Sequence, residues 1–329
     1  MYTLGIETSC DETSVAIVNK RRVLSCETVS SLNFHKKYGG IIPEIASRKH
    51  LKFIGKVTQS SLKKAKIELR KIKLVSVTQG PGLIGSLLVG VSFAKALAFS
   101  LGVPLLGVNH LFAHLFSPFL NRKKFNFPFI GLVASGGHTE IYRVSDFDRI
   151  EVLGKTKDDA AGEVLDKVGR FYGLRYPAGP EIDKLFQEEL VDKNLFRLKK
   201  KEDLSFSFSG IKTRAIYIYQ ELSKAKKIKA LDKKIILSSL QYTVINSLIN
   251  NLTKALIENK INTGVCGGGV VANSYFRKVV SQIAKKRGVK IFLPEINYCQ
   301  DNAASVAGIG EYLYQKGYKS SYQLTPFLK

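Results

Sequence analysis

The chain has 329 residues and a mass of 36.5 kDa, which fits two domains of ordinary size or one elaborate domain. Its hydrophobic content of 45% and charged content of 24% argue against a disordered or fibrous protein. The charge is unusual, because 51 Lys and Arg against 27 Asp and Glu give +24 at pH 7. Such a charge favours a polyanionic partner, nucleic acid before an anionic membrane, unless it reflects a lysine-rich composition.

Cysteine usage and the chain start indicate the compartment. Cys10, Cys26, Cys266 and Cys299 form no C-x-x-C pair, which argues against a cysteine zinc site or a disulfide framework. The first residues lack the basic and apolar regions of a signal peptide. The apolar residues 87–101 are interrupted by a lysine and are few for a membrane span. We therefore expect a soluble, cytoplasmic protein.

The first half predicts alternating strands and helices. Residues 2–6 and 14–18 are rich in β-formers and flank a polar turn, so they predict a strand hairpin. Asn109 is placed to cap a helix at its N-terminus. Further strands are predicted at 23–29, 74–78 and 103–108, and helices from Pro43, over 85–101 and over 110–120.

The second half restarts the same pattern. The polar, basic residues 121–128 predict a boundary, and residues 129–133 and 139–144 predict a second hairpin. This repetition predicts a duplicated α/β fold with domains 1–127 and 128–329. The second domain carries a helical insertion over about residues 159–260. Strands are expected at 264–266 and 290–293, and a closing helix over 301–314.

Two histidines are spaced to share a metal ion. His110 and His114 stand at i and i+4 of the predicted helix, so both imidazoles lie on one face. The zinc-protease motif H-E-x-x-H needs a glutamate where this chain has Leu111. A third ligand must come from elsewhere, and Asp301 is one candidate among several. The alternative is a pair of partly buried histidines without a metal.

Glycine-rich turns indicate a nucleotide site. Residues 80–85, 135–137 and 266–269 form such turns beside predicted strands or helices, where backbone amides can approach a phosphate. None matches a Walker motif, and a single turn of this kind is often only structural.

Acidic residues accompany these turns. Glu7, Asp11 and Glu12 crowd the first hairpin turn, and Asp166 and Asp183 lie in the second half. Carboxylates in such places bind Mg²⁺, hold a ribose hydroxyl, act as a base or cap a turn.

Basic residues gather in two stretches. Residues 48–73 hold ten Lys or Arg against one acid, and residues 199–234 hold eleven against four. This density suits the phosphates of RNA, although no RNA-recognition signature with stacking aromatics is present.

Together these features resemble one family closely. The sequences IETSCDET (6–13), GPGL (80–83), Asn109-His110 with His114, SGGHT (135–139), SFSFSG (205–210), GGGV (267–270) and QDN (300–302) occur in the order found in the tRNA N6-adenosine threonylcarbamoyltransferases (TsaD, formerly Gcp or O-sialoglycoprotein endopeptidase). The resemblance spans nearly the whole chain. It implies a duplicated actin-like ATPase fold (sugar kinase, Hsp70, actin) with two domains around a central cleft.

The resemblance also implies an activity and a set of site residues. The family transfers a threonylcarbamoyl group from threonylcarbamoyl-AMP to N6 of adenosine 37, giving t6A in tRNAs that read codons beginning with A. By position, one iron or zinc ion would be held by His110, His114 and Asp301. The substrate loop would comprise Val133, Ala134, Ser135, Gly136 and Gly137, and the adenylate and its ribose would be held by Asp166, Gly179, Asp183 and Asn273.

Partners follow from the same resemblance. Besides tRNA, we expect an inactive TsaB-like paralogue of the same fold, a TsaE-like P-loop ATPase, ATP as a further nucleotide for the cleft, and no membrane. Valine at position 133, where archaeal and eukaryotic relatives are expected to carry a metal-binding tyrosine, indicates a bacterial-type enzyme whose metal keeps an open position.

The acceptor amine of adenine is a poor nucleophile, whereas the mixed anhydride of the donor is already activated. Positioning and stabilisation of negative charge should therefore dominate catalysis. Asp11 or Glu12 is the candidate base for the amine proton. The alternatives are an actin-like nucleotide-binding switch or chaperone, a metalloprotease and, ranked last, a sugar kinase.

Overall fold

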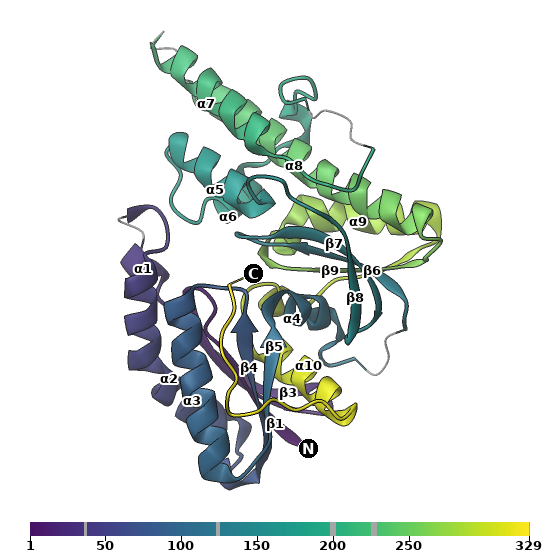
Figure 1. Ribbon diagram of the computed structural model, residues 1–329. Helices are drawn as coiled ribbons and strands as arrows, with labels where there is room; N and C mark the ends of the chain where they lie inside the picture. Colours follow the sequence, from purple (N-terminus) through teal and green to yellow (C-terminus); the bar gives the residue numbers. More distant parts are fainter. Residues whose placement is uncertain (36–37, 123–125, 198–201, 225–228, 329) are drawn as a thin grey trace. The chain divides into compact units, whose positions relative to one another are not determined.

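The structure is a computed structural model that describes residues 1–35, 38–122, 126–197, 202–224 and 229–328. The chain forms two compact units, Met1–Phe125 with Pro294–Lys329, and Asn126–Leu293 (Figure 1). Parts of two segments that the sequence singled out lie outside the described residues: 123–125 of the expected boundary, and 199–201 and 225–228 of the second basic stretch.

The first unit is built on a five-stranded mixed sheet. Its strands are β1 (Tyr2–Glu7), β2 (Glu12–Asn19), β3 (Arg22–Ser30), β4 (Ile72–Gly80) and β5 (Leu105–Asn109), in the order β3-β2-β1-β4-β5. β1 runs antiparallel to β2 and parallel to β4. The predicted hairpin is confirmed: Glu7 pairs with Ser14, and the polar turn between them joins the two strands.

Helices cover both faces of this sheet. α2 (Pro43–Ala65) and α3 (Ile84–Leu101) pack on one face, where Leu4 and Ile6 share a buried core with Ile54. Alternation turns Gly5 to the other face, against Ala303 of α10 (Ala303–Gln315). The short α1 (Leu32–His35) and α4 (His110–Phe116) complete the unit. The central strands are thus buried on both faces.

The last segment of the chain belongs to the first unit. Residues 294–329 were expected in the second domain, but α10 packs against β1, β2 and β4 of the first sheet. The reason is physical: α10 buries nine consecutive residues, Ala303 to Glu311, and the face of the first sheet around Gly5 supplies the surface that covers them. The chain thus passes to the second unit after residue 125, close to the expected boundary after residue 127, but it returns to the first unit at residue 294.

The second unit repeats the first sheet. Its strands are β6 (Phe129–Ala134), β7 (Thr139–Asp146), β8 (Arg149–Lys155), β9 (Thr263–Gly267) and β10 (Lys290–Phe292), in the order β10-β9-β6-β7-β8. β6 is antiparallel to β7 and parallel to β9, as β1 is to β2 and β4. Read from its other edge, the sheet has the topology of the first, so the duplicated α/β fold is confirmed. β8 was not predicted.

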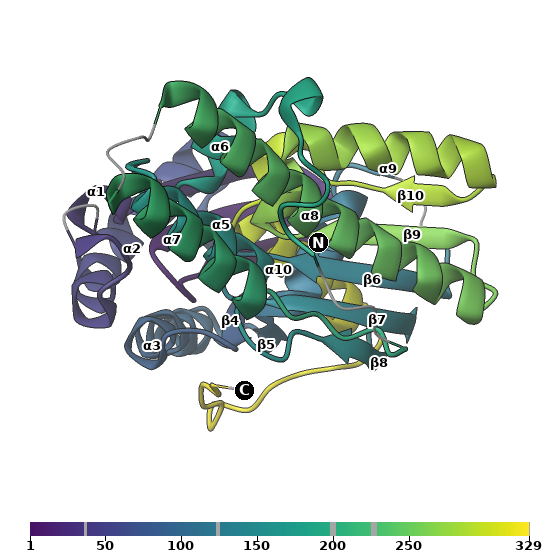
Figure 2. The ribbon, with the colours of Figure 1, turned by 90° about the horizontal axis from the view of Figure 1, so that it is seen from above.

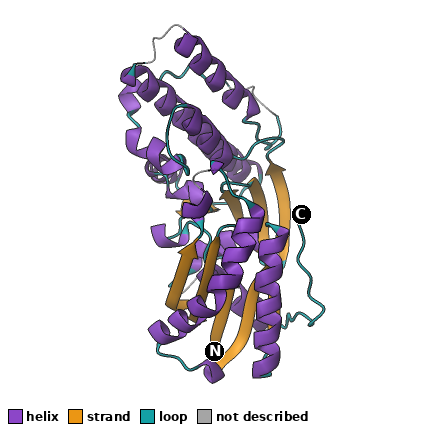
Figure 3. Ribbon diagram, turned by 90° about the vertical axis from the view of Figure 1, so that its left-hand side faces the viewer, coloured by secondary structure: helices purple, strands orange, loops and turns teal. Residues whose placement is uncertain are grey.

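Helices dominate the rest of the second unit. They are α5 (Ala161–Phe171), α6 (Gly179–Leu185), α7 (Ser209–Lys224), α8 (Ala230–Glu258) and α9 (Ser274–Arg287). α7 and α8 lie side by side (Figures 1 and 2). α8 supplies much of the core, which it shares with Ile130 and Leu132 of β6. Short 3₁₀ helices lie at Leu69–Lys71, Ser117–Phe119, Glu188–Leu190, Gly269–Ala272 and Ile296–Tyr298 (Figure 3 separates helices, strands and loops).

α3 begins one residue before the predicted helix 85–101 and ends where predicted. It has 18 residues and, by length and composition alone, is apolar enough to cross a membrane, contrary to the expectation for this stretch. It packs against β4 and α2 as a core helix does, while Leu88 and Phe99 on its outer side are exposed. Length and composition are therefore weak evidence here for a membrane span.

Candidate metal centre and donor-binding turns

The two histidines stand at the start of α4. Asn109, the last residue of β5, caps the helix as predicted: its side-chain oxygen accepts hydrogen bonds from the backbone N–H groups of Leu111 (2.8 Å) and Phe112 (3.3 Å). The cap starts the helix at His110, so His114 follows one turn later on the same face. The two imidazole centroids are 4.6 Å apart.

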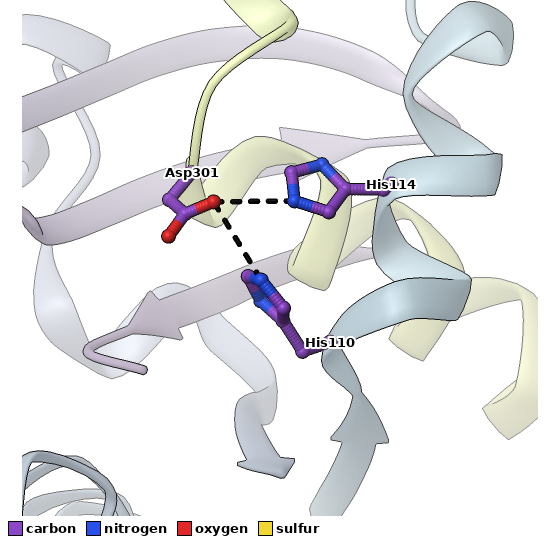
Figure 4. Close-up of side chains that lie close together, drawn as sticks. All are labelled: His110, His114 and Asp301. Carbon is purple, nitrogen blue, oxygen red and sulfur yellow. Dashed lines mark ion pairs between the residues drawn. The ribbon is translucent and has the colours of Figure 1, made fainter. Parts of the chain in front are cut away.

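Asp301 completes the group. It lies just before α10 and faces both histidines: its Oδ1 is 3.1 Å from Nε2 of His114 and 3.6 Å from Nε2 of His110 (Figure 4). One ligand atom from each of the three residues lies within 4.8 Å of the others. The sequence left Asp301 as one candidate among several, and the structure brings it to the histidines.

Nε2 of His114 supports a metal at this place. The atom is buried and makes no hydrogen bond among the described residues, although a carboxylate oxygen lies 3.1 Å away. A buried polar atom without a partner is costly, and an ion shared with Asp301 would satisfy it. Two imidazoles and a carboxylate are also a common ligand set for zinc and ferrous iron. The residues present therefore fit a divalent metal ion.

Two carboxylates lie beside His110: the buried Glu7 and the partly buried Asp301. Burial alone lowers the pKa of His110, but the carboxylates of Asp301 and Glu7 outweigh burial and raise the pKa to about 9. Burial likewise works against ionised Glu7, yet the neighbouring His110 brings the pKa of Glu7 below its ordinary value. Since His110 must be neutral to bind a metal, metal binding here would release a proton.

The two candidate bases sit at the hairpin turn near this group. Asp11 accepts a hydrogen bond from the hydroxyl of Ser30 on its Oδ2 (2.9 Å), and its backbone oxygen accepts one from the N–H of Ser31 (2.9 Å). Burial, then the carboxylates of Asp301 and Asp11, raise the pKa of Glu12 well above its ordinary value. A carboxyl group in such surroundings holds a proton more tightly than a free one.

The loop that the family resemblance assigns to the substrate is a tight turn in the second unit. Ser135, Gly136 and Gly137 join β6 to β7, and the N–H of Ser135 donates to the backbone oxygen of His138 (2.9 Å). Gly136 and Gly137 are exposed, whereas Val133 and Ala134 are fully buried strand residues. Of the five residues assigned to this loop, the turn itself therefore comprises the last three.

The second glycine-rich turn lies beside the first. Gly268, at the end of β9, has a φ of +98°, a conformation that favours glycine. A Cβ at this position would collide with the backbone oxygen of Ala134. The missing side chain thus lets the two turns approach each other at the end of the parallel pair β6 and β9.

The residues assigned to the adenylate form two groups. Asp166 of α5 accepts hydrogen bonds on Oδ1 from the N–H groups of Ala178 (2.7 Å) and Gly179 (3.0 Å) at the start of α6. Burial raises the pKa of Asp166, and these two hydrogen bonds oppose the rise. The structure thus joins Asp166 to Gly179.

The second group joins α6 to α9. Asn273 caps α9 by accepting from the N–H of Phe276 (2.9 Å). Asp183 accepts from the N–H and hydroxyl of the next residue, Ser274 (both 2.9 Å), and from the side chain of Gln241 (3.0 Å). Asp183 and Asn273 are thus neighbours through the first turn of α9.

Known proteins resemble this chain along nearly its full length. The profile of the family described as "TsaD: tRNA N6-adenosine threonylcarbamoyltransferase" matches residues 22–308. A tRNA N6-adenosine threonylcarbamoyltransferase from Thermosipho africanus is 46% identical over 328 residues, covering 98% of each sequence. One from Dictyoglomus turgidum is 45% identical over 327 residues, covering 99% of this chain and 97% of the relative. The chain belongs to the tRNA N6-adenosine threonylcarbamoyltransferase family.

The fold agrees with this membership. A solved structure of full-length HypF, in a phosphate- and nucleotide-bound form, is 14% identical with a TM-score of 0.63, covering 97% of this chain and 47% of that protein. HypF from T. kodakarensis is 14% identical with a TM-score of 0.57, covering 98% of this chain and 49% of that protein. The actin-like α/β architecture of the threonylcarbamoyltransferase family is therefore confirmed for this chain.

Sequence reasoning did not identify two residues that contact the candidate metal ligand His110. Glu7 was noted only as one of several turn acids, and Ser9 was not considered. Nδ1 of His110 lies 3.0 Å from Oε2 of Glu7 and 3.2 Å from the hydroxyl of Ser9. Spacing along the sequence carries no signal for these contacts, because they join β1 to a helix that begins about a hundred residues later.

Proposed function

We propose that this protein transfers the threonylcarbamoyl group of threonylcarbamoyl-AMP to N6 of adenosine at position 37 of tRNA. Membership of the threonylcarbamoyltransferase family supports the activity. The convergence of His110, His114 and Asp301 within 4.8 Å is the single structural observation that carries it. These three side chains would hold one divalent ion, iron or zinc.

A bound ion would supply Lewis-acid stabilisation of negative charge on the carbamoyl or phosphate oxygen. The protein's own task is to orient the donor and to place hydrogen-bond donors where charge develops. We assign the exposed backbone amides of Gly136 and Gly137 to this second role. The turn is held in place by α5, because the N–H of Gly162 donates to the backbone oxygen of Ser135 (3.2 Å).

We assign Asp166, Gly179, Asp183 and Asn273 to the adenylate part of the donor. Asp166 accepts the backbone N–H groups of Ala178 and Gly179 on Oδ1, which ties α5 to the start of α6. Asp183 already accepts three hydrogen bonds, so its contribution is to fix the start of α9 and thereby Asn273. ATP is a further nucleotide that the same residues would accept.

The attacking amine must lose a proton. We assign its acceptance to Asp11 or Glu12, because these neighbours lie where the first hairpin turn meets β2 and Glu12 interacts electrostatically with Asp301. Transfer at the wild-type rate by both Asp11→Ala and Glu12→Ala with saturating donor would contradict this role.

Partners and compartment complete the proposal. We propose that the enzyme acts on tRNA together with a TsaB-like paralogue and a TsaE-like P-loop ATPase, in the cytoplasm and without a membrane. The protease and switch alternatives are not favoured: the relatives are named as transferases, and a nucleotide switch needs no pair of histidines on a carboxylate.

The experiment is a transfer assay. The protein is incubated with threonylcarbamoyl-AMP and an unmodified tRNA carrying adenosine at position 37, with and without the candidate partners, and the nucleosides are analysed by mass spectrometry. We expect t6A to appear in at least one mixture and a tRNA with guanosine at that position to remain unmodified. Absence of t6A from every mixture, with a known family member active in parallel, would reject the function.

A further inference from the structure

We infer that Glu7 is a positioning residue for the metal: its carboxylate holds His110 in the tautomer and orientation that present Nε2 to the ion. The inference rests on the metal proposed above. It concerns a residue that touches neither the ion nor the donor and acts through His110.

Glu7 is held as a hydrogen-bond acceptor from three sides. Its Oε1 accepts the backbone N–H of Ser9 (2.5 Å), and its Oε2 accepts the hydroxyl of Thr78 (2.6 Å). The side chain is 1% exposed, so water does not compete. Oε2 also lies 3.0 Å from Nδ1 of His110. A carboxylate oxygen fixed as an acceptor requires Nδ1 to carry the hydrogen.

The consequence lies on the other side of the ring. With the hydrogen on Nδ1, the lone pair of Nε2 is free to bind a cation. Nε2 of His110 is the atom that faces Asp301, at 3.6 Å. A carboxylate behind a metal-binding imidazole fixes the ring and makes it a stronger ligand.

Two other buried histidines of the same unit, His35 and His50, carry the opposite tautomer. Nε2 of His50 lies 2.9 Å from the backbone oxygen of Cys10, which can only accept, so its hydrogen is on Nε2. Nδ1 of His35 accepts the backbone N–H of Ile42 (3.2 Å), which again leaves the hydrogen on Nε2. The Nδ1–H form of His110 is thus set by Glu7 and is not a general property of this fold.

The first test measures zinc affinity. Metal-free wild-type protein and Glu7→Gln are titrated with Zn²⁺ against a chromophoric chelator, and we expect a loss of about 10- to 100-fold in affinity for the variant. The matched control is Thr13→Val, which removes the 2.8 Å hydrogen bond to Nδ1 of His50 and should keep wild-type affinity. Circular dichroism establishes that each variant is folded. Wild-type affinity in folded Glu7→Gln would overturn the inference.

Activity separates positioning from catalysis. Because Glu7 acts through metal occupancy, excess Zn²⁺ should restore much of the t6A formation in Glu7→Gln, whereas it should not restore His110→Ala. A defect in Glu7→Gln that persists when the zinc site is shown to be full would assign Glu7 a different role.

A second measurement needs no variant of Glu7. In zinc-loaded wild-type protein labelled with ¹⁵N-histidine, the ring nitrogens report the tautomer directly, with His35 and His50 as internal references and His110→Asn to assign the signal. We expect His110 with hydrogen on Nδ1 and metal on Nε2. Metal on Nδ1 would overturn the inference even if Glu7→Gln does not fold. Failure of wild-type protein to bind Zn²⁺ would reject the proposed metal instead.

Discussion

A single carboxylate ties together two distant segments at the residue scale. Asp158, just before α5, accepts hydrogen bonds from the N–H of Phe208 (2.7 Å) and from the hydroxyls of Ser207 (2.6 Å) and Ser209 (2.8 Å). These residues belong to the SFSFSG motif, whose Phe206 and Phe208 are buried. Asp158 therefore caps the start of α7 from outside the helix, so the motif has a structural role that its sequence did not reveal.

This cap should make stability depend on pH. Burial raises the pKa of Asp158, but the hydrogen bonds from Ser207, Phe208 and Ser209 outweigh it and hold the pKa below its ordinary value of 3.8. A carboxyl group whose pKa is lower in the folded than in the unfolded protein stabilises the fold at pH values above its ordinary pKa. This stabilisation is lost as the pH falls through the pKa of the folded state. Asp158→Ala should therefore lower the free energy of unfolding by about 1 kcal/mol at pH 7, the usual cost of removing a helix cap.

Denaturant titrations at several pH values check the prediction. The difference in the free energy of unfolding between wild type and Asp158→Ala should become smaller as the pH falls below about 4. Asp158→Asn, which keeps an acceptor without the charge, is the control and should show a smaller difference at pH 7. An unchanged difference at pH 3 would mean that the charge of Asp158 does not contribute.

Gly162 offers a second test at the residue scale. It lies in the first turn of α5, where a Cβ would stand 2.7 Å from the backbone oxygen of Ser135 and 3.0 Å from the Cα of Gly136. Gly162→Ala should push the Ser135–Gly137 turn aside and raise the KM for threonylcarbamoyl-AMP, while zinc affinity stays unchanged. Steady-state kinetics measure the effect.

Gly210→Ala is the matched control. Gly210 is also in the first turn of a helix, but a Cβ there would meet no atom of the described residues within 4 Å. The substitution should leave KM unchanged and stabilise the helix by up to about 1 kcal/mol. Equal KM values for the two variants would show that the approach of α5 to the turn does not matter for donor binding.

At the scale of elements, the C-terminal tail closes the edge of the first sheet. The N–H of Ser320 donates to the backbone oxygen of Leu105 on the edge strand β5 (2.9 Å), and the N–H of Phe327 donates to the backbone oxygen of Gln79 on β4 (3.1 Å). Leu324 packs against the core of the unit. An edge strand covered in this way is shielded from pairing with another chain.

The tail should therefore contribute to stability. Leu324→Ala removes apolar contacts with the core and should lower the free energy of unfolding by about 1 kcal/mol or more. Leu328→Ala makes the same chemical change at a side chain that is 58% exposed, so it should have little effect. Thermal unfolding of both variants decides, and equal melting temperatures would show that the tail is not part of the folded core.

The elements also show how far sequence reasoning reached. The two hairpins and the Asn109 cap were predictable because each is set by residues close in the chain. β8 was missed because Arg149–Lys155 is an edge strand in which no residue is buried, so it lacks an apolar pattern. The place of α10 could not be derived, since a buried helix does not show in its own sequence which sheet covers it.

In the candidate site, too, only the features set by residues close in the chain were predictable from local sequence. His110 and His114 were predictable from spacing alone, whereas Asp301 was singled out by family resemblance and then found beside them. Glu7 was not predictable as a support of His110, because its role depends on the register of β1 against β4, which brings Thr78 to the same carboxylate.

For the whole molecule, the charge of +24 predicts how tRNA binds. Contacts between Lys or Arg and phosphates release counterions, so affinity falls steeply with salt. We expect the dissociation constant for tRNA to rise about tenfold or more between about 50 and 200 mM salt. Filter binding at several salt concentrations measures the slope. A flat dependence would mean that the positive charge reflects composition and not RNA binding.

The central claim is that one ion held by His110, His114 and Asp301 supports the transfer. The most direct measurement follows t6A formation in a single turnover while metal-free protein is reloaded with Zn²⁺ or, without oxygen, Fe²⁺. We predict activity that rises in proportion to bound metal and levels off at one ion per chain, and neither tight binding nor activity in Asp301→Ala. Full transfer by the metal-free protein, or by Asp301→Ala, would contradict the account.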